Sequence, residues 1–160
     1  MPHFPLSIRL LAIGKIRGSV FEAAGREYHQ RLQHYVEIEV MEIKTSLGKG
    51  QPAAQAVIAE GHELQRLWRE EARQIALEAA GREYSSERIA EELQHFLHVG
   101  NRKIDFILGG AAGLSEKVLQ SAHERWSLSK MTLPHELARI VLLEQLYRAC
   151  TILRGEKYHK

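Results

Sequence analysis

The sequence predicts one α/β domain, residues 1–160, with a mainly parallel sheet and helices on both of its faces. Strand-like and helix-like segments alternate along all 160 residues, with no internal repeat and no linker. Parallel strands joined by crossover helices produce this alternation. A hydrophobic content of 44% is typical of a soluble globular protein, and a chain of this length ordinarily forms a single core.

Five segments have the character of strands. Residues 6–13 form a short apolar run that stops at Gly14, which indicates a buried strand. Residues 36–43 alternate apolar and acidic side chains, which predicts a half-exposed strand near a sheet edge. The remaining predicted strands are 74–79, 104–108 and 126–128.

Helices are expected between these strands because apolar residues recur there every three or four positions. Ser85 and Ser115 are suitable N-caps for two of them. Residues 44–52 are the most loop-like part of the chain, and their Gly-Lys-Gly lacks the spacing of a nucleotide-binding phosphate loop. The predicted helices before the last one are 21–35, 53–73, 86–97 and 116–122.

The last predicted helix follows Pro134, ends before Gly155 and is apolar on more than one side. A surface helix carries one apolar stripe, so we expect this helix to be covered by the sheet and by something else. A second subunit is the simplest candidate, and we therefore predict a homodimer. Cys150, in the same helix, is the only cysteine and is interpreted as a buried structural thiol in a reduced cytoplasm.

Composition excludes several classes of function. No apolar run approaches the roughly 20 residues of a membrane-spanning helix, and the N-terminus lacks a basic leader, so we expect a cytoplasmic protein without a membrane partner. A net charge of +2 does not by itself indicate a nucleic-acid partner. His95 and His98 are three residues apart but no third ligand has a matching spacing, so no metal is expected.

Ligands of open α/β sheets bind beyond the carboxyl ends of the strands. We expect candidate ligand-binding segments at three predicted strand ends: 77–81, 108–110 and 128–133. The second contains Gly109-Gly110, where the backbone can approach a ligand closely. The segment from Gly14 lacks the glycine spacing of a dinucleotide fold. The C-terminal segment 154–160 mixes cations with Tyr and His, which suits contacts to RNA as well as a solvated end.

Four ordered motifs carry a resemblance to a known family. They are Leu-Gly-Gly-Ala-Ala-Gly-Leu (108–114), Leu-Ser-Lys-Met-Thr-Leu-Pro-His (128–135), Glu-Gln-Leu-Tyr-Arg-Ala (144–149) and the ending Gly-Glu-Lys-Tyr-His-Lys (155–160). With these motifs the chain resembles the RlmH family, small methyltransferases of the SPOUT superfamily that act on ribosomal RNA of the large subunit. The likeness extends over essentially all of the sequence and is most specific in its C-terminal half.

The resemblance implies a SPOUT-type sheet whose C-terminal part, about 74–155, is threaded as a deep trefoil knot. It also implies a homodimer that binds S-adenosylmethionine without a metal. The implied reaction is methylation of N3 of a pseudouridine in the helix 69 loop of 23S rRNA, in the ribosome and not on DNA. The residues implied to line the cofactor site are Leu77, Gly109, Leu128, Ser129, Lys130, Met131, Thr132 and Leu133.

Four residues are catalytic candidates on the same resemblance. His135 is the first candidate for accepting the N3 proton, with contact to an RNA phosphate or solvent as the other interpretation. Arg148 could orient the base or pair with Glu144 one helical turn earlier. Tyr158 and His159 are expected to reach the partner's active site. A non-catalytic RNA- or ribosome-binding module of the same fold is the alternative function.

One departure from the family concerns Arg82. Relatives often carry Gly-Lys where this chain has Gly81-Arg82. An arginine can hold a phosphate as a lysine does, although with a different geometry.

Overall fold

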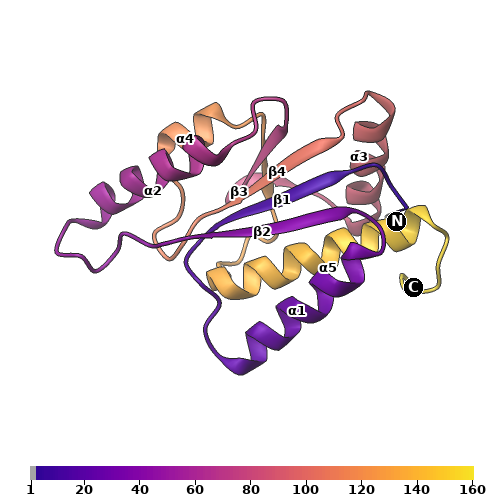
Figure 1. The fold of residues 1–160 in the computed structure, drawn as a ribbon, viewed down its shortest axis with the longest axis horizontal. Helices are drawn as coiled ribbons and strands as arrows, with labels where there is room; N and C mark the ends of the chain where they lie inside the picture. The colour runs from indigo at the N-terminus through magenta and orange to yellow at the C-terminus, as the bar shows by residue number, and fades with distance from the viewer. Residues whose placement is uncertain (1–2) are drawn as a thin grey trace.

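Five parallel strands form one sheet in the order β2-β1-β4-β3-β5 in the computed structural model, which describes residues 3–160 (Figure 1). All four strand pairings formed by these residues are parallel, which confirms the predicted fold class. The strands are β1 (Ser7–Ile13), β2 (Glu37–Ile43), β3 (Arg73–Glu83), β4 (Lys103–Leu108) and β5 (Glu124–Ser127).

Helices cover both faces of the sheet, as predicted (Figure 1). The helices α1 (Ser19–Gln33), α3 (Ser86–His98) and α5 (His135–Leu153) pack on one face, and α2 (Ala53–Leu67) and α4 (Glu116–Ser121) pack on the other. Successive side chains of a strand point to opposite faces. Leu10 and Phe106 therefore join the larger core under α1, α3 and α5, whereas Leu11 and Ile107 join the smaller one.

The strand predicted to lie near an edge does lie at one. β2 is the terminal strand of the sheet and pairs only with β1 among the described strands. Its glutamates and apolar residues alternate between exposed and half-buried positions. Because one edge of β2 has no neighbouring strand within residues 3–160, its glutamates can remain exposed to solvent.

The second helix is shorter than the pattern predicts. It was expected to continue to Arg73, but α2 ends at Leu67 and Trp68 has an extended backbone. The reason lies in Arg69, whose backbone N–H and guanidinium both donate to the fully buried carboxylate of Asp105, the closest contact being 2.6 Å. This ion pair turns the chain out of the helix and into β3.

β3 is longer than predicted because the chain crosses the neighbouring strand and pairs again. Leu77 and Arg82 both register with Trp126 of β5, so residues 78–81 pass over β5 between the two pairings. A Cβ atom on Gly81 would lie 2.7 Å from the carbonyl carbon of Trp126, so only glycine fits at the crossing. A short apolar run in the sequence does not reveal such a crossing.

The apolar sides of α5 are covered within this chain. α5 packs against the sheet, α1 and α3, and none of its residues is fully exposed. The multi-sided pattern therefore has an explanation that needs no second subunit. Cys150 is completely buried, as predicted, and burial, together with the charge of Glu156, raises the pKa of its thiol to about 12.

Candidate functional site

A cavity of about 730 Å³ opens at the carboxyl ends of β4 and β5 and at residues 77–79 of β3, where the pairing of β3 with β4 stops. These are the three segments that the sequence analysis marks for ligand binding, although β3 continues beyond its segment to Glu83. Four segments form the walls: the middle of β3, the glycine-rich turn after β4, the segment between β5 and α5, and the first turn of α5. Apolar residues of the lining are Leu77, Ala79, Leu108, Ala111, Leu114, Leu119, Leu128, Met131, Leu133, Pro134 and Ala138.

The glycine turn is held in a conformation that side chains would disrupt. Gly110 and Gly113 form an isolated bridge, with the Gly113 N–H donating to the Gly110 carbonyl at 3.0 Å. Gly113 has a φ of +79°, which favours glycine. A Cβ on Gly109 would lie 2.6 Å from the carbonyl carbon of Gly113. The backbone itself therefore forms this wall.

The segment after β5 forms the opposite wall and is fixed by its own serines. The Ser127 hydroxyl donates to the Ser129 carbonyl at 3.0 Å, and the Ser129 hydroxyl accepts from the Met131 N–H at 3.0 Å. Such hydroxyl contacts stabilise a turn without a helix or strand. This turn directs the following residues toward the glycine turn.

All of the predicted cofactor residues except Lys130 line this cavity. The Lys130 side chain points away: it is 85% exposed, and its ammonium lies 3.5 Å from Glu83. The structure thus assembles residues from three distant stretches of sequence, namely Leu77, Gly109 and Leu128, Ser129, Met131, Thr132 and Leu133.

His135 lies at the rim of the same cavity, where α5 begins after Pro134. Its imidazole Nε2 is 3.8 Å from the Glu136 carboxylate and also close to Gly14 at the end of β1. A contact of 3.8 Å is too long for a hydrogen bond. The side chain is about one-third exposed, so a large substrate can reach it.

Arg139 is a positioning residue that the sequence analysis did not identify. Its side chain is almost fully buried, and it donates to Glu42 at 2.7 Å and to the Gly14 carbonyl at 2.8 Å. These bonds tie the first turns of α5 to the ends of β1 and β2 and so fix the place of His135. A single cation inside the apolar run 137–143 was the available signal.

The other catalytic candidates form a separate cluster at the far end of α5. Arg148 binds Glu144 at 2.6 Å, which is the plain helical pairing considered above. The Tyr158 hydroxyl donates to Glu144 at 3.0 Å, and the Arg148 guanidinium lies 4.8 Å from the Tyr158 ring centre. His159 contacts Arg148 at 3.3 Å and Glu87 of α3 at 2.9 Å.

Electrostatics explain why this cluster is held together. Its hydrogen bond to Glu144 raises the pKa of Arg148, so the guanidinium keeps its charge. Burial, with bonds to Tyr28 and Glu144, raises the pKa of Tyr158. Arg148 is thirteen positions after His135, which corresponds to about 20 Å along a helix. Within one chain, therefore, the cluster does not reach the cavity rim.

Residues 3–160 contain neither a candidate metal site nor a candidate membrane span. No group of three or more His, Cys, Asp or Glu side chains is arranged there to hold a metal ion. None of the helices formed by these residues combines the length and apolar character needed to cross a membrane.

A sequence profile of the family described as "Predicted SPOUT methyltransferase" matches residues 6–159. The chain belongs to the SPOUT methyltransferase family. This SPOUT methyltransferase is 42% identical over 155 residues to "Ribosomal RNA large subunit methyltransferase H" of Anaeromyxobacter sp. (strain Fw109-5), covering 97% of this chain and 100% of the relative. It is 38% identical over 156 residues to the protein of the same name from Xanthomonas euvesicatoria pv. vesicatoria (strain 85-10), covering 97% and 99%.

A solved structure of low sequence identity shares the SPOUT methyltransferase's fold. A "probable methylase family protein" from Haemophilus influenzae Rd KW20 superimposes with a TM-score of 0.56 at 15% identity, covering 98% of this chain and 72% of that one. The resemblance to the RlmH family, first inferred from four motifs, is confirmed by the relatives' names and identities.

Proposed function

We propose that this chain transfers a methyl group from S-adenosylmethionine to N3 of a pseudouridine in the helix 69 loop of 23S rRNA, in assembled ribosomes of the cytoplasm. The observation that carries the proposal is the cavity between β3 and the ends of β4 and β5, lined by all but one of the predicted cofactor residues. Relatives named as large-subunit rRNA methyltransferases support the class of substrate.

The lining of the cavity fits S-adenosylmethionine. A volume of about 730 Å³ is within the usual range for organic cofactors, and a mainly apolar lining with a few polar groups is typical of their sites. At Gly109 a Cβ would enter space that the turn already occupies, so backbone groups are the ones presented to the ligand. When bound, this cofactor supplies a methyl group on a sulfonium centre.

The chain's own residues then position the nucleophile and remove a proton. Methyl transfer needs the attacking nitrogen in line with the methyl group, so most of the acceleration comes from orientation. His135, at the rim and partly open to solvent, is placed to accept the N3 proton. Arg139 holds the helix turn that carries His135.

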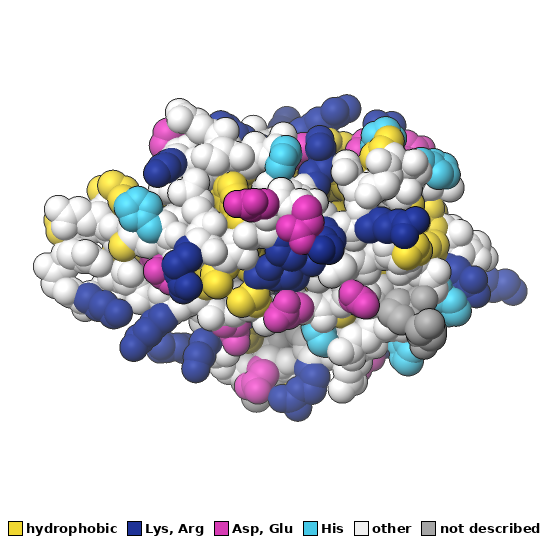
Figure 2. All heavy atoms as spheres, turned by 45° about the horizontal axis from the view of Figure 1, so that its top comes forward, with side chains coloured by type: hydrophobic (Ala, Val, Ile, Leu, Met, Phe, Trp, Pro, Cys, Tyr) yellow, Lys and Arg dark blue, Asp and Glu magenta, His cyan; other side chains and the backbone are white. Residues whose placement is uncertain are grey.

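Shape contributes more than overall charge to recognition of the ribosome. The net charge is only +2, and basic side chains lie beside acidic ones across much of the face in Figure 2. A surface of this kind gains little binding free energy from the release of RNA counterions, compared with a strongly basic surface. We therefore expect the assembled ribosome to be a better substrate than free 23S rRNA.

A homodimer would bring the two halves of the predicted catalytic set together. The cluster of Arg148, Tyr158 and His159 lies about 20 Å along α5 from His135, so it can serve a methyl-transfer site only in a second copy of the chain. This separation, rather than the apolar pattern of α5, supports the dimer. We also propose that the crossing at 78–81 and the return of 128–134 belong to a trefoil knot spanning about 74–155.

The test of the activity uses labelled methyl groups. Purified protein and S-adenosylmethionine labelled in the methyl group are incubated with ribosomes that lack this modification, and with free 23S rRNA in parallel. Label on ribosomes alone is the expected result. Label on neither substrate, with S-adenosylmethionine bound normally, would favour a non-catalytic ribosome-binding module.

A mixing experiment tests the shared site. His135→Ala and Arg148→Ala homodimers are each expected to be inactive, whereas heterodimers refolded from a mixture contain one site with both residues intact. Recovery of a measurable share of activity on mixing supports a site built from two chains. If the mixture is as inactive as its parents, while sedimentation shows dimers, the shared site is wrong.

A further inference from the structure

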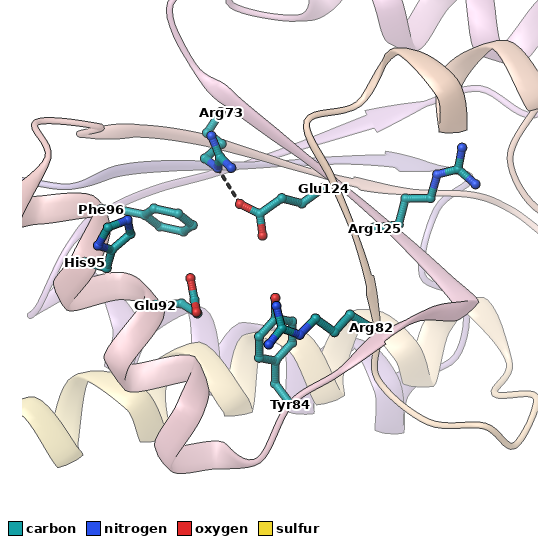
Figure 3. A pocket seen from close by; sticks show the side chains of 8 residues that line it. All are labelled: Arg73, Arg82, Tyr84, Glu92, His95, Phe96, Glu124 and Arg125. Carbon is teal, nitrogen blue, oxygen red and sulfur yellow. Dashed lines mark hydrogen bonds and ion pairs between the residues drawn. The ribbon is translucent and has the colours of Figure 1, made fainter.

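A second cavity, of about 390 Å³, lies between β3, β5 and α3 (Figure 3). It is separate from the proposed cofactor cavity, and none of the site residues predicted from the sequence lines it. Charged and aromatic side chains dominate its walls: Arg73, Arg82, Tyr84, Glu92, His95, Phe96, Glu124 and Arg125.

One side of this cavity is fixed by internal bonds. Arg73 donates to Glu124, and the second oxygen of Glu124 accepts from the Trp126 indole at 2.7 Å. The Arg73 guanidinium also lies 5.6 Å from the ring centre of Phe96, which is buried. These groups are already paired, so they shape the cavity and contribute little free charge.

The opposite side offers an unpaired cation on an aromatic support. Figure 3 shows Arg82 lying against Tyr84, and the guanidinium is 5.1 Å from the centre of the Tyr84 ring. Tyr84 in turn packs on the buried Trp126, with ring centres 4.7 Å apart. Within residues 3–160 the exposed Arg82 side chain makes no hydrogen bond or ion pair. Its charge is therefore available to a ligand.

Arg125 joins the two cavities. It lines the second cavity, donates to the Leu119 carbonyl at 2.9 Å and lies 3.4 Å from Glu78. Leu119 and Glu78 both line the proposed cofactor cavity. The two sites thus share a wall, and one extended polymer can occupy both.

Resting on the proposed function, we infer that the second cavity binds an unpaired nucleotide of the substrate RNA close to the nucleotide that is methylated. Arg82 binds its phosphate, and the base stacks on the Arg82 guanidinium, which lies over the Tyr84 ring. Single-stranded RNA is commonly held by cations combined with aromatic and guanidinium planes. Glu92 is paired with Arg88 through one carboxylate oxygen, at 2.8 Å, and its other oxygen can accept a hydrogen bond from an amino group of the base.

The small number of unpaired cations in the lining favours RNA over an acidic peptide. Arg73 is paired with Glu124, so it is not free to bind the repeated carboxylates of such a peptide. A nucleotide carries its charge on the phosphate, while its base is neutral and often has amino donors. Only one anionic group then has to meet the one unpaired arginine.

The test measures binding to ribosomes that lack the modification, by co-sedimentation at several monovalent salt concentrations and constant magnesium. Arg82→Gln is compared with Arg102→Gln, which removes an exposed arginine at the other end of the sheet, before β4. Arg82→Gln is expected to weaken binding roughly tenfold and to reduce the slope of log affinity against log salt by about 0.7, the value for one phosphate of a single strand. Arg102→Gln is expected to match the wild type.

Two further variants separate charge from stacking. Arg82→Lys should restore the salt slope without the full affinity, because an ammonium has no planar face. Tyr84→Leu should weaken binding with the salt slope unchanged, and retained S-adenosylmethionine affinity confirms that each variant is folded.

Equal ribosome affinity and salt slope for Arg82→Gln and Arg102→Gln would overturn the inference and leave the methyltransferase proposal standing. A wild type that binds no ribosomes would overturn both.

Discussion

Replacing Gly109 by alanine should damage the proposed cofactor cavity without altering its chemistry. The new Cβ would lie 2.6 Å from the carbonyl carbon and 2.7 Å from the carbonyl oxygen of Gly113. Ordinary contact begins near 3.4 Å, so the backbone of the turn must move by about 0.8 Å. Because backbone atoms cannot rotate away as a side chain can, the bridge between Gly110 and Gly113 is expected to open.

Overpacking of this kind typically costs about 1–3 kcal/mol. For a chain of this length a loss of about 2 kcal/mol lowers the Tm by roughly 4–8 °C. Calorimetry should show that fall, and titration with S-adenosylmethionine should show an affinity at least roughly tenfold weaker, equivalent to about 1.4 kcal/mol.

Gly25→Ala in α1 is the matched control. Its added Cβ would meet only the end of the Ile16 side chain, at 3.4 Å, and alanine favours the helix by up to about 1 kcal/mol. The control should therefore be as stable as the wild type or slightly more so. If Gly109→Ala behaves like this control in both measurements, the cavity is not the cofactor site and its turn is not rigid.

Other changes test the site and the core. His135→Gln should lower the rate of methyl transfer about 10²- to 10⁴-fold while S-adenosylmethionine affinity stays nearly constant; normal turnover would remove His135 as the base. Arg139→Met should lower the free energy of unfolding, measured in urea, by about 1–2 kcal/mol. Breaking a fully buried ion pair costs more, but the side chain of Glu42 is 36% exposed, so water can solvate it after the change. The same variant should also lower kcat, and the proposed positioning role fails if kcat is unchanged. Burial raises the pKa of Cys150 to about 12, so the folded state holds the thiol proton after the unfolded state has lost it. The free energy of unfolding is then independent of this group below about pH 8.5 and falls above it by up to about 1.4 kcal/mol per pH unit. In Cys150→Ala this fall with pH should be smaller. An equal slope of unfolding free energy against pH in the variant would contradict the assignment.

Hydrophobic periodicity was sufficient to predict most of the fold. The alternation in β2 predicted an edge strand, and the apolar run in β1 predicted a buried one, because both patterns depend on local burial. The ends of α2 and β3 were not predictable in this way. They depend on Asp105 and Trp126, residues distant in the sequence that become neighbours only in the folded sheet.

The same contrast holds for the candidate site. Glycines and the ends of strands identified the lining around Gly109 and Leu128, because a position where the backbone approaches a ligand closely is usually occupied by glycine. The contacts of Tyr158 with Glu144 and of His159 with Glu87 followed only from the structure, because they bring the C-terminal segment back onto α5 and α3. Arg82 was noted in the sequence as able to hold a phosphate, but the second cavity itself was not predictable, because Arg82 and Arg73, nine positions apart on β3, line one cavity only in the folded chain.

The most direct test of the central claim is mass spectrometry of the reacted RNA. Ribosomes lacking the modification are incubated with the protein and S-adenosylmethionine, and fragments of their 23S rRNA are then sequenced by mass. The account predicts one added methyl group, on a pseudouridine in the helix 69 loop, and none when the protein is omitted. A methyl group at another nucleotide would contradict the assigned target, and an unmodified 23S rRNA would contradict the assigned reaction.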